Sequence, residues 1–122
     1  MQVRVYYEDT DCMGIVYHTN YLKYCERARS EWFFKDEGKK FLEKNIFALR
    51  EIKAIYKAPA KLGDILTIKN IPQGYDKFCL SLKQEIYKDD KVIFEAYIKL
   101  VHLKDGKLAP IDEELKEYLN KS

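Results

Sequence analysis

Residues 19–35 read TNYLKYCERARSEWFFK, and the apolar side chains of this segment recur with a helical period. The spacing i, i+4, i+7 and i+11 places one set of them on a single face, namely Tyr21, Cys25, Ala28 and Trp32. Leu22 and Phe33 widen this face, and the other side carries the charged residues Glu26, Arg27, Arg29 and Glu31. The pattern predicts a helix of about 18 residues that begins near Thr19 and ends near Gly38. In a chain of 122 residues, such a helix must be a central packing element.

The sequence on both sides of this helix indicates β-strands. Residues 3–7 form a short strand-like segment, and after residue 46 the apolar period changes to two. Four further strands are expected to include residues 49–56, 65–71, 78–86 and 94–100. Turn-forming residues separate them at Gly74, at Asp89-Asp90 and at Asp105-Gly106. A short C-terminal helix is predicted from about Asp112, because Leu115, Tyr118 and Leu119 have helical spacing.

Consecutive antiparallel strands with helices segregated to one side define an α+β fold. We therefore expect residues 1–122 to form a single domain. Its antiparallel sheet of about five strands would wrap around one long central helix, which buries the apolar faces of both. The edges of such a sheet need cover, so a dimer that pairs or hides an edge strand is expected.

Composition narrows the class of protein. The net charge is only +2 and the charges are interspersed, so no stripe for binding nucleic acid is indicated. The cysteines, Cys12, Cys25 and Cys79, are odd in number and lack CxxC spacing, which favours a reducing compartment. No long apolar run suggests a signal peptide or a membrane span. The expected location is therefore the cytoplasm.

The densest set of reactive groups lies in residues 7–21, YEDTDCMGIVYHTNY. This segment is a loop of carboxylates with a glycine at position 14, and it leads into the predicted helix start. Free backbone N–H groups at a helix start can hold a developing oxyanion, and a carboxylate opposite them makes a workable acyl-transfer site. The alternative is an acidic loop that is merely well solvated and complements the helix dipole.

Two motifs resemble a known family. Residues 11–21, DCMGIVYHTNY, match the pattern D-x-x-G-x-V-x-x-x-N-Y, which is similar to the signature of the 4-hydroxybenzoyl-CoA thioesterase-like family. The flanking segments YEDTD (7–11) and ERAR (26–29) resemble the YbgC-like branch associated with the Tol–Pal envelope system. Residues 56–64, YKAPAKLGD, resemble the second recurrent segment of the family, P-A-x-x-G-D.

The resemblance implies a hot-dog fold, a homodimer or homotetramer, and hydrolysis of acyl-CoA thioesters without a cofactor. It implies that Asp11 is the catalytic carboxylate, either as a nucleophile or as the general base for water. It also implies that the backbone N–H of His18 polarises the thioester carbonyl. His18 stands where the hydroxybenzoyl enzymes commonly have tyrosine, which counts against a hydroxybenzoyl substrate. Candidates for substrate contact are Tyr7, Gly14, Val16 and Tyr17.

Several of these residues have a structural alternative. The His18 side chain either assists the reaction or caps the helix, and Tyr7 either contributes to the site or fills the core. Asn20 is expected to fix the helix start, and Cys25 to be a small core residue. A nucleophilic Cys12 is disfavoured, and no metal is expected because no acidic or histidine spacing here matches a standard ligand pattern. Lys57 and Lys61 are candidates for the CoA phosphates, although Lys53, Lys57 and Lys61 equally suit a solvated strand face.

Two alternative functions remain open. One is a thioesterase that acts on acyl carrier protein, which would need a basic patch beside the pocket. The other is a non-catalytic module of envelope lipid metabolism that binds acyl-CoA or a protein. Neither acyl chain length nor the physiological substrate follows from the sequence.

Overall fold

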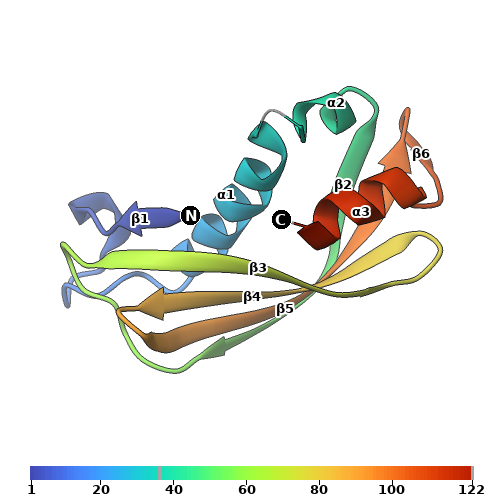
Figure 1. The fold of residues 1–122 in the computed structure, drawn as a ribbon. Helices are drawn as coiled ribbons and strands as arrows, with labels where there is room; N and C mark the ends of the chain where they lie inside the picture. The colour runs from blue at the N-terminus through green and yellow to red at the C-terminus, as the bar shows by residue number, and fades with distance from the viewer. Residues whose placement is uncertain (36, 122) are drawn as a thin grey trace.

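The structure is a computed structural model that describes residues 1–35 and 37–121. Its centre is α1, Asn20–Phe34, which lies against the inner face of a curved antiparallel sheet (Figure 1). The strands are β1 (Gln2–Arg4), β2 (Asn45–Tyr56), β3 (Ile65–Tyr75), β4 (Cys79–Lys88), β5 (Lys91–Lys104) and β6 (Lys107–Leu108). They run in the order β1-β3-β4-β5-β2, and β6 pairs with β5. The predicted α+β architecture, a curled sheet around one long helix, is confirmed.

The predicted apolar face of the helix is the buried one. Tyr21, Cys25, Ala28 and Trp32 are all buried, and so is Tyr24, which the predicted stripe did not include. The strands supply the other half of the core through inward positions at period two, among them Leu80, Leu82, Ile86, Phe94, Ala96 and Ile98. The long helix and the sheet therefore bury each other's apolar faces, as expected for two packed layers.

A polar network lies within this otherwise apolar layer. Gln84, fully buried on β4, donates from Nε2 to the Cys25 carbonyl (2.9 Å) and to Asn70 Oδ1 (2.7 Å). Its Oε1 accepts from Nη1 of Arg29 at 2.8 Å. Asn70 Nδ2 in turn donates to the Ala28 carbonyl at 3.0 Å. Buried polar groups are costly without partners, so this network ties the helix to β3 and β4 at one position.

The helix ends earlier than predicted. α1 stops at Phe34, with Lys35 extended, and a short helix, α2 (Lys39–Leu42), follows. Asp36, inside the predicted helix, lies outside the described residues. Gly38 is needed for close approach, since a Cβ there would lie 2.9 Å from the Phe33 backbone. The glycine therefore allows the chain to pass close to the end of α1 and does not itself end the helix.

Two other predicted boundaries were wrong. β1 ends at Arg4 and not at Tyr7, because Tyr7–Asp9 forms a short 3-10 helix, η1. Gly74 does not make a turn: β3 continues to Tyr75 through a bulge between Pro72 and Gly74. The other two predicted turns are confirmed, with left-handed backbone at Asp89 and Asp105. The C-terminal helix, α3 (Glu113–Lys121), begins one residue after its predicted start and buries Leu115 and Leu119.

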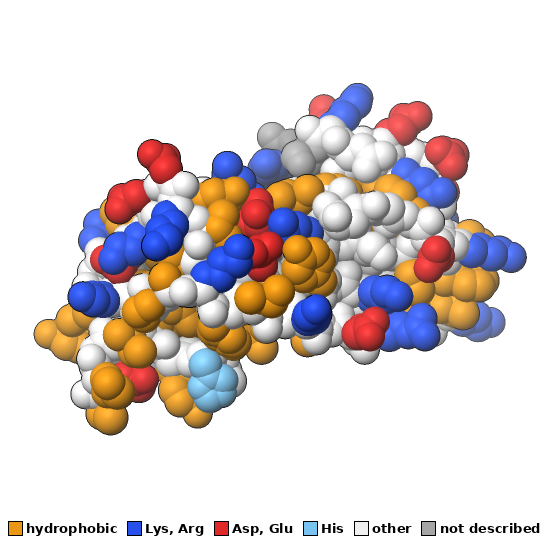
Figure 2. All heavy atoms as spheres, turned by 90° about the horizontal axis from the view of Figure 1, so that it is seen from below, with side chains coloured by type: hydrophobic (Ala, Val, Ile, Leu, Met, Phe, Trp, Pro, Cys, Tyr) orange, Lys and Arg blue, Asp and Glu red, His pale blue; other side chains and the backbone are white. Residues whose placement is uncertain are grey.

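The two edges of the sheet differ in length. β1 is three residues long, whereas β2 is twelve residues long and pairs only with β5 among the described strands. Three large apolar side chains on β2 are exposed: Ile46, Leu49 and Tyr56. On the outer face of the sheet, basic and acidic side chains are interspersed with apolar ones (Figure 2). No helix in the described part of the chain is long and apolar enough to cross a membrane.

Candidate active site

The acidic loop folds into a tight hairpin that presents Asp11. Thr10 and Val16 form an antiparallel bridge, and the Asp11 N–H donates to the Ile15 carbonyl at 2.9 Å. Gly14 closes the turn by donating to the Asp11 carbonyl at 3.0 Å, with a φ of +78° that favours glycine. The Asp11 carboxylate accepts the Met13 N–H through Oδ1 at 2.8 Å. Its Oδ2 has no partner among the described residues and is available to a ligand or water.

Asp9, which is buried, holds this loop in place through its side chain and its backbone carbonyl. Its Oδ2 accepts the Tyr6 N–H at 2.9 Å. Its carbonyl accepts from the Tyr17 N–H (2.9 Å) and from Nδ2 of Asn20 (2.8 Å). Asn20, the first residue of α1, thus ties the helix start to the loop, the structural role expected of it.

The second sequence motif packs beside the first. The Val16 N–H donates to the Ala60 carbonyl at 2.9 Å, and Ile15 forms an antiparallel bridge with Lys61. Asp64 supports this segment by accepting from the Lys61 N–H (2.7 Å) and from Lys88 Nζ (2.9 Å). Burial alone would raise the pKa of Asp64, but these two donors lower it overall. Residues 56–64 therefore support the Asp11 loop through their backbone contacts with it.

His18 lies in the turn that opens α1. The Asn20 N–H donates to the Tyr17 carbonyl at 2.9 Å, which makes residues 17–20 a β-turn with His18 at its second position. The His18 carbonyl accepts from the Tyr56 hydroxyl at 2.7 Å, whereas its N–H has no acceptor in the described part of the chain. The helix cap is Thr19, so the alternative that His18 caps the helix is wrong. A free, partly positive N–H at a helix start is a suitable oxyanion donor.

Tyr56, to which no sequence pattern assigns a role, fixes this turn through its hydroxyl. Its ring contacts Phe94 edge-on with centroids 5.0 Å apart, and Phe94 stacks on Tyr21 at 5.2 Å. Tyr21 accepts the Ala60 N–H at 3.1 Å, so the aromatic cluster joins both motifs. Burial raises the pKa of Tyr21 and of Tyr56, so both hydroxyls stay protonated at neutral pH. An aromatic residue in a half-buried strand carries no sequence signal for such a role.

The candidates for substrate contact lie in different environments. Tyr7 is 81% exposed, so its alternative as a core aromatic is wrong. Gly14 and Tyr17 are exposed, and Val16 is only 4% exposed, with its side chain in the core. Met13, two residues after Asp11, and Leu62, whose N–H donates to the Gly14 carbonyl at 3.3 Å, are also exposed. The expectation that Cys25 is a core residue is confirmed, and burial raises the pKa of its thiol to about 12.

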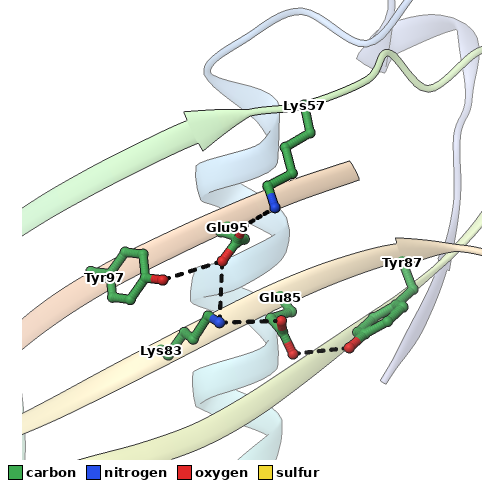
Figure 3. Close-up of polar contacts among 6 residues, drawn as sticks. All are labelled: Lys57, Lys83, Glu85, Tyr87, Glu95 and Tyr97. Atoms are coloured by element: carbon green, nitrogen blue, oxygen red, sulfur yellow. Dashed lines mark hydrogen bonds and ion pairs between the residues drawn. The ribbon is translucent and has the colours of Figure 1, made fainter. Parts of the chain in front are cut away.

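The lysines do not share one strand face, because β2 ends at Tyr56 before Lys57 and Lys61. Lys57 forms an ion pair with Glu95, which also accepts from Lys83 (3.1 Å) and from the Tyr97 hydroxyl (3.2 Å) (Figure 3). The two lysines, Lys57 first, lower the pKa of Glu95 to about 2. Lys61 is exposed, and its ammonium forms no direct ion pair among the described residues, although its charge helps to lower the pKa of Asp64. Of the two candidates, Lys61 is the one free to meet a phosphate.

Within residues 1–35 and 37–121, no group of three or more His, Cys, Asp or Glu side chains is placed to hold a metal ion. The candidate reactive groups of the loop are Asp11, the His18 N–H and the His18 imidazole, which is exposed and whose ring centroid lies 4.5 Å from that of Tyr17. Such a set can polarise a carbonyl and deliver a nucleophile to it, which is the chemistry of acyl transfer.

Comparison with known proteins agrees with this chemistry. A sequence profile of the thioesterase-like superfamily matches residues 5–119, and the chain therefore belongs to that superfamily. Among its relatives is the acyl-CoA thioesterase YbgC of Helicobacter pylori, 53% identical over 87 residues; the alignment covers 71% of this chain and 65% of that protein. The acyl-CoA thioester hydrolase YbgC of Escherichia coli is 34% identical over 113 residues, which cover 88% of this chain and 84% of that protein.

Solved structures show the same fold. A hypothetical protein from Aquifex aeolicus superposes with a TM-score of 0.88 at 27% identity, covering 98% of this chain and 97% of that one. The probable thioesterase YbaW of Escherichia coli superposes with a TM-score of 0.84 at 28% identity, covering 99% and 96%. The resemblance to the 4-hydroxybenzoyl-CoA thioesterase-like family and the expected hot-dog fold are both confirmed.

Proposed function

We propose that this protein is an acyl-CoA thioesterase, which hydrolyses the thioester of acyl-CoA to a free acid and CoA. The observation that carries the proposal is that one short segment supplies both the exposed Asp11 carboxylate loop and, at the start of α1, a His18 N–H with no acceptor in the described part of the chain. The superfamily membership and the names of the two YbgC relatives support the same reaction class. The reaction needs water and no cofactor.

In the proposed mechanism the thioester carbonyl oxygen accepts the His18 N–H, which stabilises the negative charge that develops on it. One such donor lowers the barrier by about 3 kcal/mol. Asp11 then acts in one of two ways. As general base, its free Oδ2 takes a proton from the water that attacks the carbonyl carbon. As nucleophile, Oδ2 forms an anhydride that water later cleaves. In both routes the carbon–sulfur bond breaks, and the CoA thiolate leaves and takes up a proton.

Substrate contacts follow from the positions around the loop. The exposed side chains of Tyr7 and Tyr17 and the open backbone at Gly14 would line the approach to Asp11. Val16 would contribute only through its backbone carbonyl, since its side chain is buried and its N–H donates to the Ala60 carbonyl. The His18 imidazole, exposed beside the N–H donor, would help to place water or substrate. Lys61 is the better of the two candidates for a CoA phosphate, because Lys57 is committed to Glu95.

The proposed assembly is a homodimer, or a homotetramer built from it, in which β2 pairs with its copy. A strand of twelve residues with one free side and exposed Ile46, Leu49 and Tyr56 is an edge that needs cover. An isologous pair of such strands closes both edges at once. Tyr56 also bonds the His18 carbonyl, so this interface would adjoin the candidate active site. We place the protein in the cytoplasm because its three cysteines are free.

The test is thiol release from a series of acyl-CoAs, from acetyl-CoA to palmitoyl-CoA, with the matching acyl carrier protein thioesters as a second series. Hydrolysis of at least one acyl-CoA well above the rate in buffer would support the proposal. Hydrolysis of carrier-protein thioesters alone would replace acyl-CoA with that substrate. Tight binding of acyl-CoA with no hydrolysis of either series would instead identify a non-catalytic module of envelope lipid metabolism.

A further inference from the structure

A groove of about 430 Å³ lies beside the middle of β3. β1 covers this side of β3 only as far as Ile68, and α3 reaches the strand again at Tyr75, whose hydroxyl donates to Asn120 Oδ1 at 3.0 Å (Figure 1). Residues 69–72 lie between these two contacts, and among the described strands they pair with β4 alone. The opposite wall of the groove comes from one side of α1, with Ala28, Glu31, Trp32 and Lys35.

The main chain of Asn70 presents unpaired groups to this groove. In an antiparallel ladder the N–H and C=O of one residue point to the same side, and the side alternates along the strand. The Ile68 N–H donates to the Met1 carbonyl at 2.8 Å, and the Met1 amino nitrogen donates to the Ile68 carbonyl at 3.2 Å. The N–H and C=O of Asn70, two residues further on, therefore point away from β4, and neither has a partner among the described residues. Such an edge is a template for another strand.

A further donor in the groove also lacks an acceptor. Trp32 is 4% exposed, and its indole N–H has no partner in the described part of the chain. A buried donor of this kind costs stability until a bound molecule supplies an acceptor. The groove therefore contains two unpaired donors and one unpaired acceptor. An extended polypeptide supplies a C=O and an N–H for Asn70 in register and another carbonyl for the indole.

The side chains around the groove define what such a peptide should carry. Residues that face each other across an antiparallel pair have their side chains on the same side of the sheet. A residue opposite Asn70 would therefore point towards α1 and Trp32, as the Asn70 side chain does. A residue opposite Lys69 would point to the outer face, where the Lys69 ammonium lies over the Tyr87 ring. Glu31, exposed on α1, would repel an acid on the inner face, so acidic side chains fit on the outer face.

We propose that this groove binds an extended peptide of another protein, which adds to β3 as an antiparallel strand in line with β1. Its central side chain is apolar and lies against α1, and the residues on either side are acidic and lie on the outer face near Lys69. The stretch between β1 and α3 accommodates about four residues at about 3.4 Å each. The inference goes beyond the thioesterase reaction and does not depend on it, because none of the groups assigned to that reaction lines the groove.

The test uses a five-residue peptide, blocked at both ends, with leucine at its centre and glutamate on either side. Its matched control carries an N-methyl group on the leucine, which removes the N–H that would donate to the Asn70 carbonyl. Binding to the purified protein is followed by the fluorescence of Trp32, the single tryptophan, and by hydrogen exchange of the Asn70 amide. We expect saturable binding of the first peptide that slows exchange at Asn70, and an affinity about tenfold lower for the N-methylated peptide.

Two variants test the position of the acidic side chains. Lys69→Gln should weaken binding of the glutamate peptide about two- to fivefold, whereas Lys23→Gln, an equal change at an exposed position of α1 outside the groove, should leave it unchanged. Equal affinity for the two peptides, equal affinity in the two variants, or unchanged exchange at Asn70 would overturn the proposal. Protection of the Asn70 amide that rises with protein concentration in the absence of peptide would assign this edge to a second copy of the chain, and would overturn it too.

Discussion

His18 has a backbone N–H donor and an imidazole side chain, and their contributions to kcat can be measured separately. His18 occupies the second position of the turn 17–20, where proline is favoured, so His18→Pro keeps the turn and removes the N–H. We expect His18→Pro to lower kcat by about 100-fold, as loss of one oxyanion donor does. His18→Ala keeps the N–H and should cost about tenfold or less. Steady-state thiol release on the best acyl-CoA measures both.

Thermal unfolding serves as the control for this pair, since both variants should keep the melting temperature of the wild type within a few degrees. If His18→Ala were as inactive as His18→Pro, the imidazole and not the backbone N–H would be the essential group. That result would contradict the assignment of the oxyanion donor.

Glu95 is expected to make the free energy of unfolding depend on pH in the acidic range. Its pKa is lowered to about 2 in the folded protein, so it stabilises the native state above its ordinary pKa of about 4.5. This stabilisation is lost as the pH falls from about 4.5 towards 2. Glu95→Gln should therefore be less stable than the wild type near neutral pH, and the difference should shrink on acidification. Urea unfolding at a series of pH values measures it.

A matched control for this prediction is Glu117→Gln, because Glu117 is exposed and has no ion-pair partner among the described residues. Its stability should stay parallel to that of the wild type across the same pH range. A constant gap between wild type and Glu95→Gln down to the lowest pH would show that the ion pairs of Figure 3 do not lower the pKa of Glu95.

Among the elements, the contact between α1 and β4 depends on Gln84. Gln84→Met preserves volume but leaves Arg29, Asn70 and the Cys25 carbonyl without their partner. We expect a loss of about 2–3 kcal/mol in the free energy of unfolding. Gln73→Met, an equal change at an exposed position of β3, should cost less than about 0.5 kcal/mol. Equal stability of the two variants in urea would show that the network contributes little.

The proposed pairing of β2 with its copy can be tested by substituting Leu49, which is 53% exposed. Leu49→Lys would place a charge in the proposed interface, where desolvation opposes it, so the dimer should dissociate to a monomer. Light scattering coupled to size exclusion measures the mass. Leu108→Lys is the matched control, since Leu108 is 54% exposed on β6, and it should keep the wild-type mass. A monomeric wild type would contradict the proposed interface.

The sequence predicted the elements that have a regular repeat of apolar residues. It did not predict η1 or the bulge in β3, which depend on individual contacts. The stripe Tyr21 to Trp32 identified α1, because a helix buried on one face must repeat its apolar residues. η1 is closed by local bonds, among them those from the Tyr6 N–H to the Asp9 carboxylate and from the Asp9 N–H to the Tyr6 carbonyl, and the bulge near Gly74 depends on pairing with β4. Neither leaves a periodic signal. The buried Gln84 likewise occupies an inward position that period two predicts to be apolar.

At the scale of the whole molecule, the candidate site is a tertiary assembly of two motifs. The pattern at residues 11–21 could be recognised from sequence, because its residues are contiguous. The residues that support this segment could not be recognised in the same way. Ala60 and Tyr56 lie about 40 residues later in the chain, and they contact the loop only in the folded protein. In the folded protein β2 ends before Lys57, and Lys57 forms an ion pair with Glu95. The spacing of the lysines in the sequence could not show either feature.

Asp11, the proposed catalytic carboxylate, is tested by the kcat of Asp11→Asn. The substitution keeps an oxygen that can accept the Met13 N–H, so the loop should stay folded, but the carboxylate is lost. Asp76→Asn, at an exposed turn, is the matched control. We predict that Asp11→Asn lowers kcat by at least about 100-fold with little change in substrate affinity, while Asp76→Asn stays at the wild-type rate. An Asp11→Asn protein as active as the wild type would show that the Asp11 carboxylate is not catalytic.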